Sequence, residues 1–476
     1  MSDQPVTPDH LLSMAESYRA ELGGEFHDRL MDSIYDEASR ISQHAVVQAG
    51  QQGRFYFDRL LDRALTSRLW GFPVMGLMLA GVFWLTIAGS NVPSSLLAEF
   101  LTGTVYTALH GLAASIGLPW WLSGFLIDGM YLGTAWVVSV MLPPMAIFFP
   151  LFTLLEDFGY LPRVAFNLDR LFSRAGAHGK QALTMMMGYG CNAAGVVSTR
   201  IIDSPRERLI AIITNNFSIC NGRWPTLILM GTIFVGAVVP PALASFVAAG
   251  SVVAVAVIGI FFTLAVSWFL SRTWLKGEAS AFSLELPPYR PPQILKTLYT
   301  SLIDRTLIVL WRAVTMAAPA GALIWLLGNI SPGGISLAER LVSLLDPVGL
   351  LFGLNGVILL AYIVAIPANE IIIPTILMLT LMVGGSDLVQ AGVMIEFEDL
   401  NQVRDVLVNL GGWTALTGIN LMLFSLLHNP CSTTILTIWN ETRNLRWTVV
   451  AALLPIGLGL AVTFLTTSVA RLIGLV

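Results

Sequence analysis

Long apolar runs constrain the fold of this 476-residue chain more than any other feature of its sequence. Hydrophobic residues make up 55% of the chain and charged residues only 12%, whereas soluble domains carry about 25% charged residues. A run of about 20 apolar residues crosses a bilayer as a helix, because unpaired backbone groups are costly in lipid. Seven runs reach that length: residues 69–88, 131–155, 209–239, 242–270, 307–327, 411–439 and 449–469. The sequence therefore predicts an all-α polytopic membrane protein.

The charged residues predict which ends of these runs face the cytoplasm. Residues 1–68 hold 18 of the 56 charged residues and space their apolar residues as a helix does. We expect a cytoplasmic amphipathic linker there, or a docking surface for a partner, and no cleavable signal peptide. Basic residues precede the first run, and residues 91–119 contain no Arg or Lys, so the first crossing runs outwards. The net charge of −4 indicates no nucleic-acid partner.

Two further apolar runs are interrupted, and each predicts a re-entrant hairpin. Run 182–199 has basic residues on both flanks, with Gly188 and Asn192 near its middle, which favours a hairpin that enters from the inside. Run 350–383 is broken at residues 367–370 (Pro-Ala-Asn-Glu), and its far flank is acidic. That pattern favours a hairpin that enters from the outside.

The two halves of the chain match each other in this reading. Each half has a crossing, a broken hairpin and a crossing with a polar break, and the basic flanks assign opposite orientations to the halves. Short echoes support the match: residues 190–193 resemble 367–370, and residues 217–220 resemble 424–427. We therefore predict an inverted repeat with re-entrant hairpins, in which transporters bind substrate between discontinuous helices. The expected function is translocation of a small solute or ion.

The predicted domain boundaries follow from this pattern. They are a linker, 1–68; the first transmembrane helix with an extracytoplasmic segment, 69–130; the first repeat with the helix after it, 131–270; a cytoplasmic loop, 271–306; the second repeat, 307–440; and a C-terminal transmembrane helix, 441–476.

Several short motifs occur in order along both halves. The first half contains residues 155–166 (Leu-Glu-Asp-Phe-Gly-Tyr-Leu-Pro-Arg-Val-Ala-Phe), 188–192 (Gly-Tyr-Gly-Cys-Asn) and 199–200 (Thr-Arg). The second half contains residues 285–290 (Glu-Leu-Pro-Pro-Tyr-Arg), 368–370 (Ala-Asn-Glu), 430–431 (Pro-Cys) and 441–442 (Glu-Thr). In order and spacing these motifs resemble the membrane domain of the FeoB ferrous iron transporter family. The resemblance extends from Arg54 to the C-terminus.

The resemblance implies two Gate domains, akin to those of the nucleoside-recognition family. They would conduct ferrous iron into the cytoplasm across a prokaryotic cytoplasmic (inner) membrane, with Fe²⁺ as substrate and no permanently bound cofactor. FeoB proteins carry an N-terminal GTPase domain, and no Gly-x-x-x-x-Gly-Lys-Ser/Thr phosphate loop occurs here. The resemblance thus implies a transporter without its own GTPase. A separate small GTPase would dock near the linker or the cytoplasmic loop, a small Feo accessory protein is a second expected partner, and homo-oligomerisation stays open.

All three cysteines of the chain lie at breaks in apolar runs, which suggests a transition-metal path. Cys191 follows a glycine, Cys220 precedes an Asn-Gly break, and Cys431 follows a proline. Sulfur, imidazole and carboxylate groups all ligate ferrous iron, although a lone buried cysteine more often has a structural role. A closed thiolate cage would hold the ion too tightly to conduct. We therefore expect a transient mixed site.

Oxygen ligands are predicted at the two hairpins. An ionisable group inside a membrane segment costs roughly 2.5–3.5 kcal/mol, so Glu370 is a functional candidate by default. The alternative for Glu370 is a buried salt bridge to Arg223. Asn192 and Asn369 would supply amide oxygens at the hairpin tips, or would only cap them.

Three weaker candidates complete the predicted metal path. Glu156 and Asp157 end the second crossing, where they would form an exit-side relay or would simply be solvated at the membrane boundary. His428 would donate imidazole, or would satisfy local hydrogen bonds. The chief alternative function is a Gate-type carrier of a nucleoside or other small organic solute, and a non-transporting scaffold is a third. An enzyme is least expected, because no catalytic motif is present.

Overall fold

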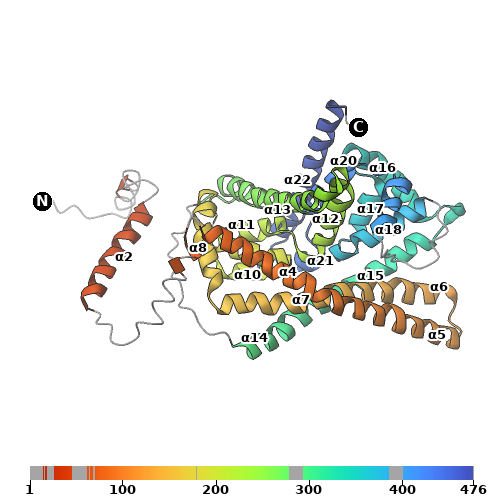
Figure 1. Cartoon of the computed structure of the whole chain (residues 1–476), viewed down its shortest axis with the longest axis horizontal. Helices are drawn as coiled ribbons and strands as arrows, with labels where there is room; N and C mark the ends of the chain where they lie inside the picture. The colour runs from red at the N-terminus through yellow and green to blue at the C-terminus, as the bar shows by residue number, and fades with distance from the viewer. Residues whose placement is uncertain are drawn as a thin grey trace.

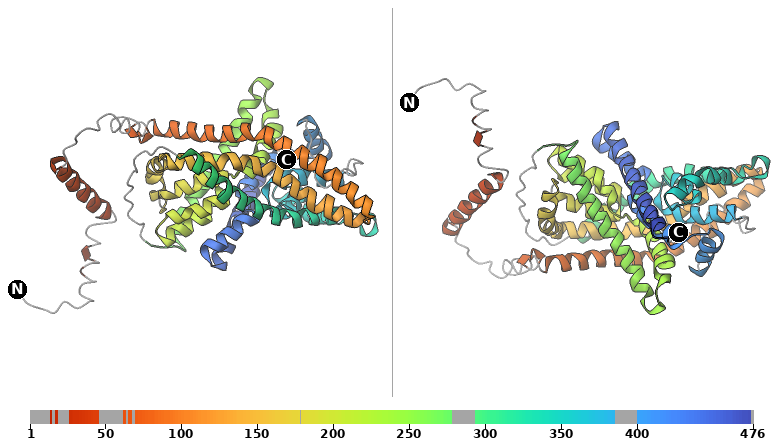
Figure 2. Two further views of the ribbon diagram at one scale, coloured as in Figure 1. Left: turned by 90° about the horizontal axis from the view of Figure 1, so that it is seen from below. Right: turned by 90° about the horizontal axis from the view of Figure 1, so that it is seen from above.

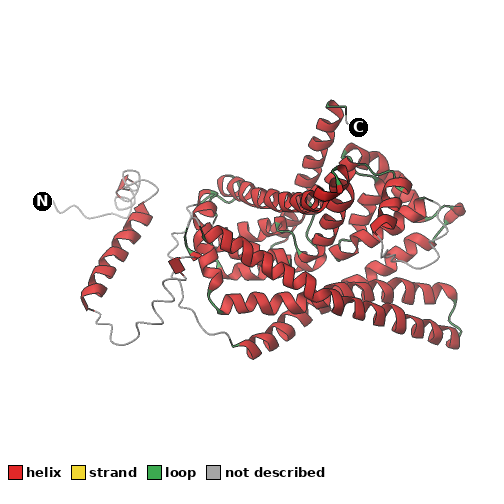
Figure 3. Cartoon of the chain, in the orientation of Figure 1, coloured by secondary structure: helices red, strands yellow, loops and turns green. Residues whose placement is uncertain are grey.

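The computed structural model describes residues 14, 17–18, 26–45, 62–63, 65–67, 70–177, 179–277, 293–384 and 400–474. Every regular element in these residues is a helix (Figure 3). The first long one, α2 (Phe26–Ala45), lies within the predicted linker. Most of the rest of that linker lies outside the described residues, as do the motif at 285–290 and the middle of the predicted cytoplasmic loop.

Two long helices run side by side along the molecule (Figures 1 and 2). The outgoing one comprises α4 (Gly71–Ala98), the π-helical η1 (Glu99–Val105) and α5 (Tyr106–Ile116). The returning one comprises α6 (Trp120–Ser123), the π-helical η2 (Gly124–Tyr131) and α7 (Leu132–Asp157). At 1.5 Å per residue the outgoing helix is about 69 Å long, more than twice the ~30 Å that a helix needs to cross the hydrocarbon core. The predicted extracytoplasmic segment is therefore largely a continuation of the first helix.

Six helices in the described residues are long and apolar enough to cross a membrane: Gly71–Ile116, Trp120–Asp157, Leu243–Arg272, Leu310–Asn329, Ala415–Thr442 and Leu445–Leu472. A bent pair, Leu337–Leu351 and Gly356–Val364, turns through 109° and would make a seventh span if counted as one. Six of the seven predicted crossings coincide with the six helices. The seventh, the crossing with a polar break predicted over 209–239, is not among these six helices, because the chain there is divided into short helices by an extended segment at 218–220.

The first half contains a hairpin followed by a crossing that is broken into short helices. The first hairpin is α9 (Lys180–Gly190) and α10 (Asn192–Ser198), followed by the short η3 (Thr199–Ile201). Next come α11 (Pro205–Thr214), η4 (Asn215–Phe217), an extended stretch at 218–220, η5 (Asn221–Arg223), α12 (Trp224–Met230), η6 (Gly231–Val235) and η7 (Gly236–Val238). A glycine in η5 and buried amides in η4 interrupt the apolar run, which is why one helix does not form.

The second half also contains a hairpin followed by a broken crossing. After α16 (Leu337–Leu351), a hairpin is made by α17 (Gly356–Val364), η10 (Asn369–Ile371) and α18 (Ile372–Val383). The broken crossing after it is α20 (Ala415–Leu427) and α21 (Ser432–Thr442); in Figure 1 α21 is labelled near the middle of the molecule and α20 above it. A short segment of α19 (Leu400–Arg404) and η12 (Asp405–Leu410) precedes α20.

The remaining helices enclose these broken segments. They are α8 (Tyr160–Arg174), α13 (Pro241–Arg272), α14 (Ile294–Thr300), η8 (Ser301–Leu307), α15 (Ile308–Asn329) and α22 (Leu445–Leu472). Small residues allow the backbones of α15 and α7 to lie close together. A Cβ built on Gly133 would lie 3.1 Å from the Cα of Gly321, and such glycine contacts are typical of helix packing in membranes.

Candidate functional site

The backbone breaks of both halves meet around one small cavity of about 40 Å³. The lining comes from α7, α15, both hairpins and both broken crossings, and comprises Met141, Met145, Gly190, Cys191, Asn192, Cys220, Asn221, Gly222, Ala313, Pro367, Ala368, Asn369, Glu370, Cys431, Thr433 and Thr434. All three cysteines of the chain are in this set. Six of the nine predicted ligands thus line the same cavity.

The tips of the two hairpins have nearly the same backbone. Cys191 is extended, with φ −150° and ψ 121°, and Ala368 is extended, with φ −150° and ψ 123°. Each of these residues precedes a buried asparagine that begins the next helical segment. Cys220 and Cys431 also stand directly before a helical segment in extended geometry. Every cysteine therefore occupies the position at which a helix starts.

The two asparagines attach the hairpin tips to the break in the first half. The Asn369 Nδ2 donates to the Cys220 sulfur at 3.6 Å. Its Oδ1 is buried and has no hydrogen-bond partner among the described residues. The Asn192 amide, oriented to satisfy its N–H groups, donates to the carbonyls of Gly188 (2.9 Å) and Ser218 (3.2 Å). Asn192 therefore ties its hairpin to the break, whereas Asn369 keeps a free oxygen at the cavity.

A glycine of the first half makes room for the carboxylate of the second. A Cβ built on Gly222 would lie 2.6 Å from the Glu370 Cδ, so no larger residue fits without moving that side chain. Glu370 lies in η10 and is partly exposed, on the wall of the cavity. The segments of Gly222 and Glu370, which come from different halves, thus form one wall of the site.

Arg223 does not pair with Glu370, and the predicted alternative of a buried salt bridge between them is wrong. Arg223 is fully buried, and its guanidinium donates to four backbone carbonyls, those of Asn216 (2.9 Å), Leu426 (3.0 Å), His428 (3.1 Å) and Asn429 (3.1 Å). Three of these carbonyls lie at the end of α20, where the last carbonyls of a helix lack intrahelical partners and carry partial negative charge. Arg223 of the first half therefore caps a helix of the second half.

The other three predicted ligands lie outside the cavity lining. His428 is 1% exposed, and its Nδ1 lies 3.3 Å from Arg223 Nη2. Asp157 ends α7, where its Oδ2 accepts a hydrogen bond of 2.7 Å from the Thr297 hydroxyl, and Glu156 precedes it. Within the described part of the chain, no group of three or more His, Cys, Asp and Glu side chains is arranged to hold a metal ion. This arrangement is therefore not a closed cage.

The cavity also contains residues that sequence reasoning missed. Met141 and Met145 of α7 add two thioethers, which are soft ligands. Their signal in the sequence was a four-residue spacing across Pro143 and Pro144. Thr433 and Thr434 are the other missed residues, and the Thr434 hydroxyl lies 3.3 Å from the Cys431 sulfur.

Two family models match the chain, and both bear on this cavity. The Gate model, described as nucleoside recognition, matches residues 138–234 and 310–444, which contain every residue of the cavity lining. The model described as the C terminus of ferrous iron transport protein B matches residues 252–304. This chain belongs to the FeoB family. Its matched parts are those of the FeoB membrane portion, which confirms the resemblance inferred from the motifs.

Curated FeoB relatives match most of this FeoB-family chain. The "Fe(2+) transporter FeoB" of Staphylococcus aureus (strain COL) is 28% identical over 465 residues, which cover 97% of this chain and 66% of the relative. That of Synechocystis sp. is 29% identical over 416 residues, 86% of this chain and 63% of the relative. That of Salmonella typhimurium is 32% identical over 241 residues, 50% of this chain and 30% of the relative. The chain thus spans just under two thirds of the length of the first two relatives. No solved structure matches it.

Proposed function

We propose that this chain conducts ferrous iron, or a closely similar divalent transition metal, through the cavity between the two hairpins. One observation carries the proposal. All three cysteines of the chain, from three separate backbone breaks, line one cavity together with a carboxylate and an unpartnered amide oxygen. The relatives that cover most of the chain are named as Fe(2+) transporters, which is consistent with this chemistry.

The proposed ligands are Cys191, Cys220, Cys431, Glu370 and the Asn369 oxygen, with Asn192 as a tether of the first hairpin. Sulfur and oxygen together suit a borderline metal such as Fe²⁺. Thiols must lose a proton to bind a metal, and a helix N-terminus stabilises the negative charge that results. Because these groups are not already arranged as a cage, the ion would bind transiently and leave.

We also propose that the two Gate segments form an inverted repeat in which the hairpins enter from opposite sides. Support comes from the near-identical backbone angles at Cys191 and Ala368 and from the basic residues that flank only the first hairpin. Substrate sites between such discontinuous helices are typical of this architecture. The orientation, with a cytoplasmic N-terminus, is tested by labelling single cysteines from either side of the membrane.

The alternative, a carrier of a nucleoside or other organic solute, is less favoured by the size of the cavity. Pockets for organic ligands usually measure about 300–1,000 Å³, whereas this cavity has about 40 Å³. That space holds an ion with a water molecule or two. The cavity lining is also rich in sulfur, which is a soft metal ligand.

Reconstitution of the purified chain in liposomes tests the proposal. Uptake of Fe²⁺, Mn²⁺, Zn²⁺ and a labelled nucleoside would be measured for the parent and for Cys191→Ser, Cys220→Ser, Cys431→Ser and Glu370→Gln. Binding of Co²⁺, monitored by its thiolate absorption, separates ligation from transport. We expect metal uptake that each substitution lowers roughly tenfold or more. Met316→Leu on α15, outside the cavity lining, is a control. Nucleoside uptake without metal uptake would overturn the proposal.

A separate small GTPase and a small Feo accessory protein remain proposed partners. Each would be tested by co-purification with the chain from detergent and by its effect on metal uptake in the liposome assay. The predicted docking loop at 271–306 has its middle outside the described residues. A chimera that replaces this loop would test whether the GTPase docks there.

A further inference from the structure

A line of polar side chains runs from the cavity along one face of α21. Thr433 and Thr434, in the first turn, line the cavity, Thr437 lies one turn later, and Glu441 lies near the end of the helix. Spacings of three and four residues place them on one helical face. Thr434 and Thr437 are both buried. The rise from Thr434 to Glu441 is about 10 Å, so this polar face joins the cavity to the far end of α21.

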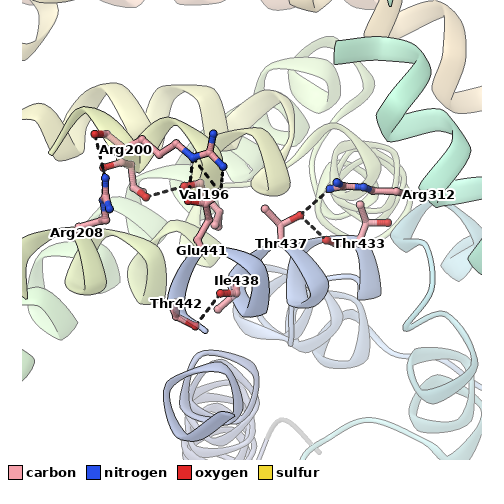
Figure 4. Close-up of polar contacts among 10 residues, drawn as sticks. Val196, Arg200, Arg208, Arg312, Thr433, Thr437, Ile438, Glu441 and Thr442 are labelled. Carbon is pink, nitrogen blue, oxygen red and sulfur yellow. Dashed lines mark hydrogen bonds and ion pairs between the residues drawn. The ribbon is translucent and has the colours of Figure 1, made fainter. Parts of the chain in front are cut away.

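Two helices pack beside this face, and an arginine lies in or directly after each of them. Helices α10 and α15 both pack against α21, and they contribute Asn192 and Ala313 to the cavity lining. Arg200 follows α10, in η3. Arg312 directly precedes Ala313, and its Nη1 lies 3.5 Å from the Thr437 hydroxyl (Figure 4). The polar face of α21 therefore has a positive charge beside its middle and another at its end.

Arg200 and Glu441 form a bidentate ion pair at the far end of this polar face. The Arg200 Nη2 lies 2.6 Å from Glu441 Oε1, and the Arg200 Nε lies 3.0 Å from Oε2 (Figure 4). The Arg208 guanidinium donates to the backbone carbonyls of Thr199 and Arg200, at 3.4 and 3.2 Å. The backbone of Arg200 is thus held in place, and its side chain is the part that can move.

The two members of this ion pair differ in exposure. The side chain of Arg200 is 64% exposed, whereas that of Glu441 is 9% exposed. The arginine can swing into water at little cost, because exposed ion pairs contribute little to stability. The carboxylate cannot follow, and a nearly buried carboxylate without a partner is costly. A second cation that takes the place of Arg200 would therefore keep this carboxylate partnered.

We propose that Glu441 is a second cation site on the route out of the cavity, and that Arg200 occupies this site in the closed state. This inference rests on the proposed function, since it assumes that a divalent metal ion leaves the cavity along α21. The incoming ion displaces the guanidinium from the carboxylate, the ion then leaves to water, and Arg200 returns to close the site. Basic residues around Arg200 assign this end of the line to the cytoplasm.

The charges along the line explain why the exchange would control passage. In the closed pair, the positive charges of Arg200, Arg208 and Arg312 exceed the single negative charge of Glu441, and a cation is repelled. When Arg200 turns outwards, one positive charge leaves the line, and the repulsion falls. The movement of Arg200 therefore both opens the route and lowers the electrostatic barrier to a cation. No other side chain has to gain or lose a proton.

A charge swap separates this role from a purely structural one. The full chain would be assayed in liposomes as Arg200→Gln, Glu441→Gln and the double variant Arg200→Glu/Glu441→Arg. We expect Glu441→Gln to lower Fe²⁺ uptake roughly tenfold or more and Arg200→Gln to retain or raise it. The double variant should regain the melting temperature of the parent without regaining uptake, because its carboxylate is exposed and its buried residue is cationic. Recovery of both would overturn the proposal, as would loss of uptake in Arg200→Gln.

The matched control is the ion pair of Lys180 and Asp203, which lies 2.9 Å apart at the start of the first hairpin and does not line the cavity. Lys180→Gln and Asp203→Asn should leave uptake unchanged. Co²⁺ binding at the cavity thiols should be the same in Glu441→Gln as in the parent. If the parent shows neither Co²⁺ thiolate absorption nor metal uptake, the proposed function fails. If the parent transports and Glu441→Gln transports equally well, only the role of Glu441 fails.

Discussion

The tips of the two hairpins differ in side chain although their backbones nearly coincide. In the first hairpin the extended residue is Cys191, followed by Asn192, whereas in the second it is Ala368, followed by Asn369 and Glu370. The first tip therefore offers a thiol and the second a carboxylate. The two tips therefore share the backbone conformation of the helix break. They differ in the side chain that each places at the cavity.

The two halves also differ in the contacts that they contribute to the interface between them. Arg223 of the first broken crossing caps the carbonyls at the end of α20, and Gly222 beside it leaves room for Glu370. The corresponding stretch of the second half, residues 428–430, contains His, Asn and Pro and no arginine. The first half thus supplies the helix cap and the space beside Gly222, and the second half supplies the Glu370 carboxylate that occupies this space.

Removal of Arg223 should have the largest effect, since it breaks the connection between the halves. Arg223→Met would leave several buried carbonyls without donors, at a cost of about 3–5 kcal/mol by analogy with broken buried pairs. We expect aggregation, or a strongly lowered melting temperature, in size-exclusion chromatography and thermal unfolding in detergent. Arg404→Gln, at an exposed position of α19, is the control. A parent-like melting curve for Arg223→Met would show that the cap is dispensable.

Gly222→Ala should have the second largest effect, because it disturbs the carboxylate and leaves the Arg223 cap in place. The added methyl group would overlap the Glu370 carboxyl group, which must shift from its place on the cavity wall. We expect Fe²⁺ uptake to fall roughly 10- to 100-fold, as in Glu370→Gln, with a melting temperature close to that of the parent. Gly457→Ala on α22, where nothing lies within 4 Å, is the matched control. Normal uptake by Gly222→Ala would remove Glu370 from the path.

Ala368→Cys tests the asymmetry directly by giving both tips a thiol. The backbone angles at position 368 already accommodate a cysteine, as they do at position 191. A fourth thiol should tighten binding of soft ions such as Cd²⁺ by roughly tenfold, and it should slow Fe²⁺ release in the liposome assay. Ala368→Ser adds a group of similar size without the sulfur. Faster transport by Ala368→Cys would contradict the idea that the mixed ligand set prevents trapping.

The sequence was sufficient to predict the breaks and their residues. Glycine, proline and asparagine inside apolar runs marked both hairpins, and the cysteines beside them proved to line one cavity. The partners across the breaks could not be predicted in this way. Arg223 bonds to carbonyls more than 200 positions away, and no local pattern distinguishes a helix cap from a salt bridge to Glu370. The long helical pair was also missed, because apolar and weakly polar residues continue a helix without marking where the membrane ends.

Substitution of Glu156 and Asp157 should have the smallest effect on Fe²⁺ uptake. The result decides whether the metal ion leaves at the end of α7 or at the end of α21. From the sequence they were expected as an exit-side relay, yet they lie outside the cavity lining, and Asp157 is engaged with the Thr297 hydroxyl. An asparagine can accept the same hydrogen bond, so Asp157→Asn should change stability by no more than about 0.5 kcal/mol. Fe²⁺ uptake by Asp157→Asn and Glu156→Gln should stay within twofold of the parent, roughly the scatter of such assays, whereas Glu441→Gln should lose roughly tenfold or more. The reverse result would place the exit at the end of α7 and would leave the polar face of α21 as helix packing.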